Sequence, residues 1–184
     1  MSFQIKICNR KARAQIKKYQ EDGWYVIDVT SKSPTHSQFS PFYPHGGITI
    51  NDYVSESVEG LWQGLKVFES TGIDTSKFKI TNMKNLKRTS EKYGKVIGHQ
   101  YNYYNGNAEL VDYITARHII YIPAYNQVLY TKLQKELNEF RTILQDPTYK
   151  GIVLLDYDTN EDPNDATKPL SHASLIKKHL EQTY

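Results

Sequence analysis

The segment SVEGLWQGLK, residues 57–66, brings an acid, an amide and a base together at helical spacing. On a helix with about 100° per residue, Glu59, Gln63 and Lys66 lie within about 60° of one another, beside the apolar stripe that faces the core. A carboxylate and an ammonium group that are half-buried on adjacent turns shift each other's pKa, as catalytic acids and bases require. An exposed helix with a surface ion pair has the same spacing, so the pattern supports both a catalytic pair and a structural one.

Two glycines in the same segment predict that another part of the chain packs closely against this helix. Gly60 and Gly64 each cost roughly 1 kcal/mol relative to alanine in a helix interior, and glycine is favoured where another segment approaches the backbone closely. The preceding residues 32–47 contain three prolines and several aromatic rings, which predicts an ordered loop. We expect Phe42 and Tyr43 of this loop to cover the polar edge of the helix as the wall of a pocket.

The loop SPFYP at residues 40–44, followed by SVEGLWQGLK at residues 57–66, resembles the two-part signature of the NADAR superfamily of N-glycosidases. In that family a serine-asparagine-phenylalanine-tyrosine-proline loop precedes a serine-valine-glutamate helix with a glutamine and a lysine. The resemblance is specific over residues 40–66 and looser beyond them. Pro41 replaces the asparagine, Gly60 replaces a histidine, and LLDYDTNEDPND replaces a C-terminal tryptophan-glycine motif.

The resemblance implies an N-glycosyl hydrolase that uses no cofactor. One branch of the family hydrolyses ribosylamine intermediates of riboflavin synthesis. Another removes ADP-ribose from guanine bases of DNA, which reverses the action of DNA-modifying toxins in phage or antitoxin settings. We expect the second activity, with ADP-ribosylated DNA as the partner and ADP-ribose as the product. The alternatives are the riboflavin-pathway activity and a module that binds ADP-ribose or nucleic acid without turnover.

The family pattern, carried over residue by residue, assigns Glu59 and Lys66 to catalysis. Cleavage of an N-glycosidic bond builds positive charge at C1 of the ribose, which a carboxylate such as Glu59 stabilises while it activates water. Lys66 either holds a phosphate or hydroxyl group or, when neutral, attacks the ring-opened sugar as a Schiff-base nucleophile. The expected substrate-binding residues are Ser40, Phe42, Tyr43, Ser57, Trp62 and Gln63, together with Arg88 from a basic segment.

The run DYDTNEDPNDAT, which follows an apolar stretch, is a second candidate site. Its acids follow the spacing of a calcium-binding loop, but Glu161 stands where that loop needs glycine and Thr167 where it needs a bidentate glutamate. We therefore expect no metal in this run, and the histidine spacing with a single cysteine predicts no zinc site elsewhere. Asp156, Asp158 and Asn160 either bind ribose hydroxyls or form a solvated turn.

The charge pattern bears on nucleic-acid binding. The net charge of +3 excludes a dedicated nucleic-acid coat protein, but residues 1–20 carry six Lys and Arg without an acid, and residues 79–95 carry six against Glu91 alone. Both segments either attract phosphate or form solvated helix faces, and the tyrosine cluster QYNYYNGN either stacks on a base or belongs to strands. The single cysteine and the lack of a long apolar run predict a cytoplasmic protein with no membrane partner and leave its oligomeric state open.

Helices and short strands must position these residues. The polar and basic residues 71–106 predict short helices and loops. The sequence as a whole predicts an α+β fold, helix-rich with a small β-sheet, in a single domain over residues 1–184. Predicted helices cover residues 9–22, 57–66, 123–146 and 171–182, and predicted strands cover residues 24–31, 48–50 and 151–158.

Overall fold

A computed structural model describes residues 4–182, which fold as an α+β protein of two compact units. Unit 1 combines the residues up to Ser40 with those from Leu129 onward, and unit 2 is the continuous segment Pro41–Val128. The predicted fold class is confirmed. A single domain over residues 1–184 stays a prediction, and its first three and last two residues lie outside the described range. No helix among the described residues is long and apolar enough to cross a membrane.

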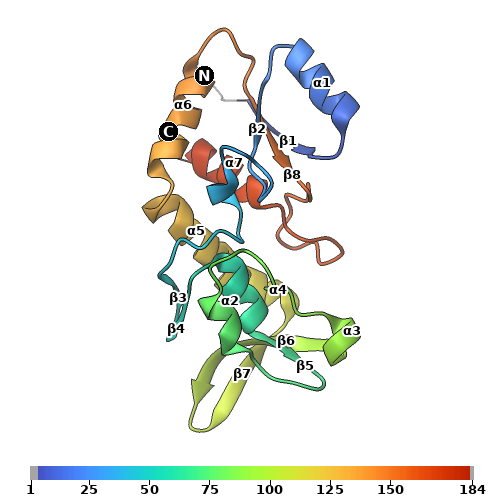
Figure 1. The fold of residues 1–184 in the computed structure, drawn as a ribbon, viewed down its shortest axis with the longest axis vertical. Coiled ribbons are helices and arrows are strands. Elements are labelled where there is room, and N and C mark those ends of the chain that lie inside the picture. The colour runs from blue at the N-terminus through green and yellow to red at the C-terminus, as the bar shows by residue number, and fades with distance from the viewer. Residues whose placement is uncertain (1–3, 183–184) are drawn as a thin grey trace. The chain divides into compact units, whose positions relative to one another are not determined.

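Unit 1 is built around a parallel sheet of β1 (Ile5–Asn9), β8 (Ile152–Asp156) and β2 (Tyr25–Asp28), in that order (Figure 1). Every residue of the central strand β8 is buried, as expected for an apolar strand that is covered on both faces. The other elements of unit 1 are α1 (Arg13–Glu21), η1 (Ser37–Phe39), α6 (Gln134–Gln145) and α7 (His172–Gln182).

The beginning of unit 1 differs from the sequence prediction. The helix predicted over residues 9–22 begins at Arg13, because Asn9 is the last residue of β1, a strand that the prediction lacks. Asn9 Oδ1 accepts a hydrogen bond from the Lys11 backbone at 2.8 Å, and Asn9 Nδ2 donates to the Tyr157 carbonyl at 2.7 Å. The Asn9 side chain therefore ties the end of β1 to the loop after β8 and does not cap α1.

The long helix predicted over residues 123–146 is divided into α5 (Ile122–Thr131) and α6. Leu133 leaves helical geometry, with φ −116° and ψ 17°, while its side chain stays buried. Gln134 Nε2 donates to the Leu129 carbonyl at 2.7 Å and so satisfies one of the free carbonyls at the end of α5. The apolar spacing continues through the break, which is why the sequence alone predicts one helix.

Unit 2 contains the short helix α2 (Val58–Gly64), in which every residue is buried. One antiparallel sheet pairs β3 (Ile48–Ile50) with β4 (Tyr53–Ser55). A second antiparallel sheet has the order β5 (Lys66–Phe68), β6 (Val96–Tyr104) and β7 (Asn107–Val111). The remaining elements are η2 (Thr75–Lys79), α3 (Ser90–Tyr93), α4 (Tyr113–Ala116), the π-helical turn η3 (Arg117–Tyr121) and the first part of α5.

The tyrosine cluster lies on the hairpin of β6 and β7, so its interpretation as part of strands is confirmed, whereas the short helices and loops predicted over residues 71–106 do not include this hairpin. Tyr103 and Tyr104 are 63% and 66% exposed near its tip. The hairpin therefore presents two aromatic rings to solvent.

The two glycines of α2 mark the face on which η2 packs. A Cβ atom at Gly60 would lie 2.6 Å from the Lys77 carbonyl oxygen, and one at Gly64 would lie 2.3 Å from Cε1 of Phe78. Neither distance is compatible with a side chain, so the predicted close neighbour is confirmed. This packing leaves α2 enclosed on the side where an amphipathic surface helix would meet water.

Replacing Gly60 by alanine is expected to lower the free energy of unfolding by about 1–3 kcal/mol, because the new methyl group meets backbone that cannot rotate away. Urea unfolding of the purified variant measures the change. Gly72→Ala is the matched control, since a Cβ atom at Gly72 meets nothing within 4 Å. Equal stability of the Gly60→Ala variant and wild type would contradict the close packing of η2 on α2.

Candidate functional site

The polar residues of SVEGLWQGLK lie along α2 and at both of its ends in unit 2. Glu59 and Gln63 lie one turn apart, and Gln63 Nε2 donates a hydrogen bond to Glu59 Oε1 at 2.7 Å. The prediction that Lys66 continues the helix is wrong, because α2 ends at Gly64 and Lys66 is the first residue of β5. Lys66 pairs with His99 of β6 instead. The acid and the base therefore come from two different elements.

Burial shifts the pKa values of this acid and base toward each other. It raises the pKa of Glu59, and the Gln63 hydrogen bond and the charges of Lys66 and Lys87 offset only part of the rise. Burial also lowers the pKa of Lys66; the Glu59 charge opposes this change, while Arg88 and Lys87 add to it. Among the described residues Glu59 and Lys66 form no ion pair with each other. Burial thus brings the two pKa values closer together than those of an exposed glutamate and lysine.

Arg88 fixes the junction between α2 and β5. Its Nη1 donates to the carbonyls of Gln63 at 3.2 Å and Lys66 at 2.7 Å, and its Nη2 donates to the Gly72 carbonyl at 2.6 Å. The Arg88 backbone N–H also donates to Gln63 Oε1 at 3.0 Å, which directs the Gln63 amide nitrogen toward Glu59. Only 5% of Arg88 is exposed. Its guanidinium therefore orients the site from within, and its predicted contact with substrate stays a prediction.

Aromatic rings enclose α2 on the side of Trp62. The Trp62 ring centroid lies 3.9 Å from that of His99, 5.6 Å from that of Tyr121 and 5.9 Å from that of Tyr113. Tyr121 belongs to the π-helical turn η3, and such turns occur frequently at functional sites. Trp62 is buried among these rings, and its predicted contact with substrate stays a prediction.

His99 is a polar residue of this region that the sequence prediction missed. It is 1% exposed, and neither ring nitrogen has a hydrogen-bond partner among the described residues. Burial, together with the charge of Lys66, lowers the pKa of His99 to about 3, and an interaction with the Trp62 backbone that falls short of hydrogen-bond geometry opposes this only weakly. The ring is therefore neutral at physiological pH. No sequence signal marks it, because only the pairing of β5 with β6 brings His99 beside Lys66.

Replacing His99 by phenylalanine is expected to keep the free energy of unfolding unchanged or to raise it by about 1 kcal/mol. The substitution removes two buried nitrogens that lack partners and keeps an aromatic ring against Trp62. Urea unfolding of the variant and wild type measures the difference. A loss of more than about 2 kcal/mol would show that the nitrogens are paired in solution and that His99 is a structural residue.

The loop that carries Phe42 and Tyr43 meets the beginning of α2. The Glu59 backbone N–H donates to the Pro41 carbonyl at 2.9 Å, so a backbone hydrogen bond connects the loop to the helix at Glu59. Phe42 and Tyr43 are half-buried. Ser57 is the N-cap of α2, where its hydroxyl accepts a hydrogen bond from the Gly60 N–H at 2.9 Å. Ser40, also predicted to bind substrate, is buried at the last position of the first segment of unit 1.

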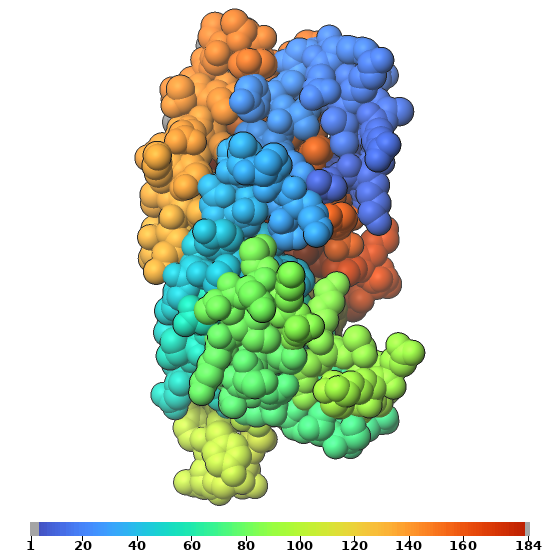
Figure 2. All heavy atoms as spheres, viewed as in Figure 1, coloured from blue at the N-terminus to red at the C-terminus, as the bar shows by residue number. Residues whose placement is uncertain are grey.

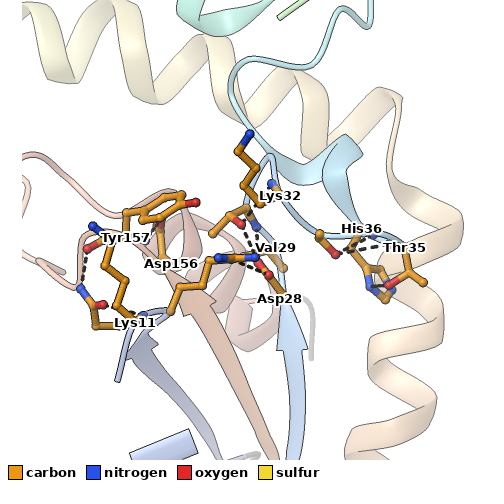
Figure 3. Close-up of polar contacts among 12 residues, drawn as sticks. Lys11, Asp28, Val29, Lys32, Thr35, His36, Asp156 and Tyr157 are labelled. Atoms are coloured by element: carbon orange, nitrogen blue, oxygen red, sulfur yellow. Dashed lines mark hydrogen bonds and ion pairs between the residues drawn. The ribbon is translucent and has the colours of Figure 1, made fainter. Parts of the chain in front are cut away.

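The second candidate site lies in unit 1, where Asp156 is the last residue of β8 (Figure 3). Asp156 Oδ2 accepts hydrogen bonds from Ser171 Oγ at 2.7 Å and the Ala173 N–H at 3.2 Å, and lies 3.0 Å from His172 Nδ1. Asp156 Oδ1 accepts from the Tyr157 N–H at 2.7 Å. Asp156 is 3% exposed, so its carboxylate holds the fold of this loop together.

The rest of the acidic loop is ordered by its own hydrogen bonds. Asn160 Nδ2 donates to the carbonyls of Asp162 at 3.1 Å and Lys168 at 3.3 Å. Asp158 is half-buried and adds to the negative potential at His172. Among residues 4–182 no group of His, Cys, Asp and Glu side chains is arranged to hold a metal ion. Binding of ribose by this loop stays a prediction.

Comparison with known proteins yields one family. No curated protein matches the sequence. A model of the family of unknown function DUF6939 matches residues 8–176, which is most of the chain, so the protein belongs to this family.

Proposed function

We propose that the protein is an N-glycosyl hydrolase that removes ADP-ribose from ADP-ribosylated guanine bases in DNA and so reverses a DNA-modifying toxin. The observation that carries the proposal is the buried Glu59 carboxylate, which Gln63 holds by a 2.7 Å hydrogen bond within electrostatic reach of Lys66. The resemblance of residues 40–66 to the NADAR signature supports the same reaction.

The reaction uses Glu59 in two ways. When the bond between ribose C1 and the guanine nitrogen breaks, positive charge develops on C1, and a nearby carboxylate stabilises it most effectively where water is excluded. The same carboxylate takes a proton from the attacking water as the new C–O bond forms. The raised pKa of Glu59 makes it a stronger base than an exposed glutamate.

Lys66 has one of two roles. Its lowered pKa increases the fraction of neutral amine, which attacks C1 of the ring-opened sugar, displaces the guanine nitrogen together with a proton, and is released when water hydrolyses the Schiff base. As an ammonium group it holds a phosphate or hydroxyl group instead. Borohydride added during turnover separates these roles, since only a Schiff base is reduced to a stable adduct that mass spectrometry locates on Lys66.

DNA as the substrate is supported by features of unit 2. The base must leave a duplex or come from a single strand to reach a buried carboxylate. Exposed Tyr103 and Tyr104 offer faces on which neighbouring bases stack, and the segment 79–95 supplies cations for the phosphates. The reaction then takes place in the cytoplasm, or in the host cytoplasm if a phage encodes the protein.

The test is incubation of the purified protein with a single-stranded oligonucleotide that carries one ADP-ribosylated guanine. Free ADP-ribose and an unmodified oligonucleotide are expected. Binding without release would replace the hydrolase by a module that recognises modified nucleic acid. Release from a ribosylamine intermediate of riboflavin synthesis, with the oligonucleotide left intact, would assign the small-molecule activity instead.

A further inference from the structure

A cavity outside the region of Glu59 lies in the basic segment that follows η2. It is an open surface depression with a volume of about 270 Å³. In Figure 2 the green segment near residue 80 forms part of the visible molecular surface. The residues that line the cavity come from one continuous stretch: Lys79, Ile80, Thr81, Asn82, Lys84 and Asn85.

The chemistry of this lining suits an oxyanion. Between Asp74 and Glu91 the chain carries five cations and no acid. Two of these cations are engaged, because Lys77 Nζ donates to the Asn85 carbonyl and Arg88 donates to carbonyls around α2. The ammonium groups of Lys79 and Lys84, by contrast, make no hydrogen bond, ion pair or ring contact with any described residue.

The backbone around the cavity includes two residues in the left-handed region, of which Met83 is in an unfavourable conformation. Met83 has φ 59° and Asn85 has φ 57°, both in the left-handed region, which is unfavourable for a long side chain such as methionine. Asn82 Oδ1 accepts a hydrogen bond from the Lys84 N–H at 3.0 Å, and the Lys77 contact fixes the other end of the turn. Strained backbone that is maintained by surrounding contacts is concentrated at ligand-binding segments. These contacts hold the turn that carries the cavity.

The volume limits the ligand. Pockets for small organic ligands have volumes of about 300–1,000 Å³, and this cavity lies just below that range. It accommodates a phosphate or pyrophosphate group better than a whole nucleotide. Two ammonium groups, one hydroxyl and two amides provide donors for several phosphate oxygens.

We propose that this cavity, the phosphate pocket, binds a phosphate group of the substrate through Lys79 and Lys84. The inference rests on the proposed function for the identity of the substrate. Phosphate reaches the pocket from one of two sources, the pyrophosphate of ADP-ribose or the backbone of DNA. The source determines whether the protein recognises the modification alone or the nucleic acid that carries it.

Binding measurements with two unreactive probes test the pocket without requiring turnover. The probes are ADP-ribose and an unmodified single-stranded oligonucleotide of about 12 nucleotides. The Lys79→Gln/Lys84→Gln double variant is expected to bind one probe about tenfold more weakly than wild type. If that probe is the oligonucleotide, the slope of log K against log salt also falls by about 0.7 for each phosphate that the protein no longer neutralises. The Lys79→Arg/Lys84→Arg variant, which keeps both charges, is expected to restore binding.

The Lys135→Gln/Lys150→Gln double variant is the matched control, because both lysines are exposed, lie outside the two basic segments and do not line the cavity. Weakening confined to ADP-ribose identifies the pyrophosphate, and weakening confined to the oligonucleotide identifies the DNA backbone. Unchanged binding of both probes, or equal weakening by the Lys135→Gln/Lys150→Gln control, would overturn the pocket. If binding depends on Lys79 and Lys84 but no ADP-ribose is released, the pocket is supported and the proposed hydrolase is rejected. If ADP-ribose is released but binding does not depend on these lysines, the hydrolase is supported and the pocket is rejected.

Discussion

Replacing Glu59 by glutamine is expected to lower kcat for release of ADP-ribose by about 10²–10⁴-fold. The amide has nearly the same shape as the carboxylate but neither stabilises positive charge at C1 nor accepts a proton from water. The Gln63 amide donates to Glu59 Oε1, and the amide oxygen of the substituted side chain accepts the same hydrogen bond, so binding of the oligonucleotide is expected to remain. Single-turnover release of ADP-ribose, followed by chromatography, measures the rate.

The pH dependence of wild type gives an independent check on Glu59. Burial raises the pKa of Glu59 above its ordinary value of 4.5, and the reaction needs the ionised form. The acid limb of the pH–kcat profile should therefore fall at a higher pH than an exposed glutamate would give. Glu91→Gln, at an exposed position of the same unit, is the control and should behave as wild type. Full activity of Glu59→Gln would remove Glu59 from the mechanism.

Replacing Asp156 by asparagine is expected to lower the free energy of unfolding by about 3–5 kcal/mol at mildly acidic pH. Asp156 Oδ2 lies 3.0 Å from His172 Nδ1, and His172 Nε2 lies 2.9 Å from the Val29 carbonyl oxygen. Both neighbours of the ring are acceptors, so both ring nitrogens donate and the imidazole is charged. The asparagine variant leaves this cation buried without its counter-charge.

The pH window follows from the two pKa shifts. The charge and hydrogen bond of Asp156 raise the pKa of His172 against the effect of burial, so its contribution is complete below the ordinary value of 6.5 and is lost as pH rises through the raised pKa. Burial alone would raise the pKa of Asp156, but His172, Ser171 and the Ala173 N–H together lower it. Its contribution is therefore present above the ordinary value of 3.8 and is lost as pH falls through the lowered pKa.

The difference in stability between wild type and Asp156→Asn should thus be largest between pH 3.8 and 6.5 and should shrink on the alkaline side. Urea unfolding at several pH values measures it. Asp22→Asn, at an exposed aspartate of unit 1, is the control and should show little change at any pH. A difference that stays constant with pH would mean that His172 does not titrate with Asp156.

Local patterns in the sequence predicted much of the secondary structure. The apolar run GIVLLDYD predicts β8, and the spacing of Leu175, Ile176 and Leu180 predicts α7. The β1 strand could not be recognised, because its partner β8 lies far along the chain and Asn9 also reads as a helix cap. Parallel strands are joined by long connections, so no short turn motif marks such a pair in the sequence.

Around Glu59, the sequence predicted the positions of only those residues that lie on the helix α2. Helical period places Gln63 beside Glu59, and the glycine pair predicts a close neighbour, which proved to be η2. Lys66 was predicted on the wrong element, since the end of α2 depends on Arg88, a residue distant in sequence. His99 reaches this region through sheet pairing alone. Contacts between segments that are distant in the sequence therefore determine the positions of Lys66 and His99, which helical periodicity alone does not predict.

The position of β8 in the sequence also determines the order in which the two units can fold during synthesis on the ribosome. β1 and β2 pair with β8 and not with each other, and β8 begins at Ile152, long after β2 ends at Asp28. At about 5–20 residues per second, synthesis of the intervening chain takes on the order of ten seconds. The segment Pro41–Val128 carries both strands of every pair in its own sheets and can fold during that interval. The nascent β1 and β2 therefore have no strand partner, and their edges stay open, until β8 emerges.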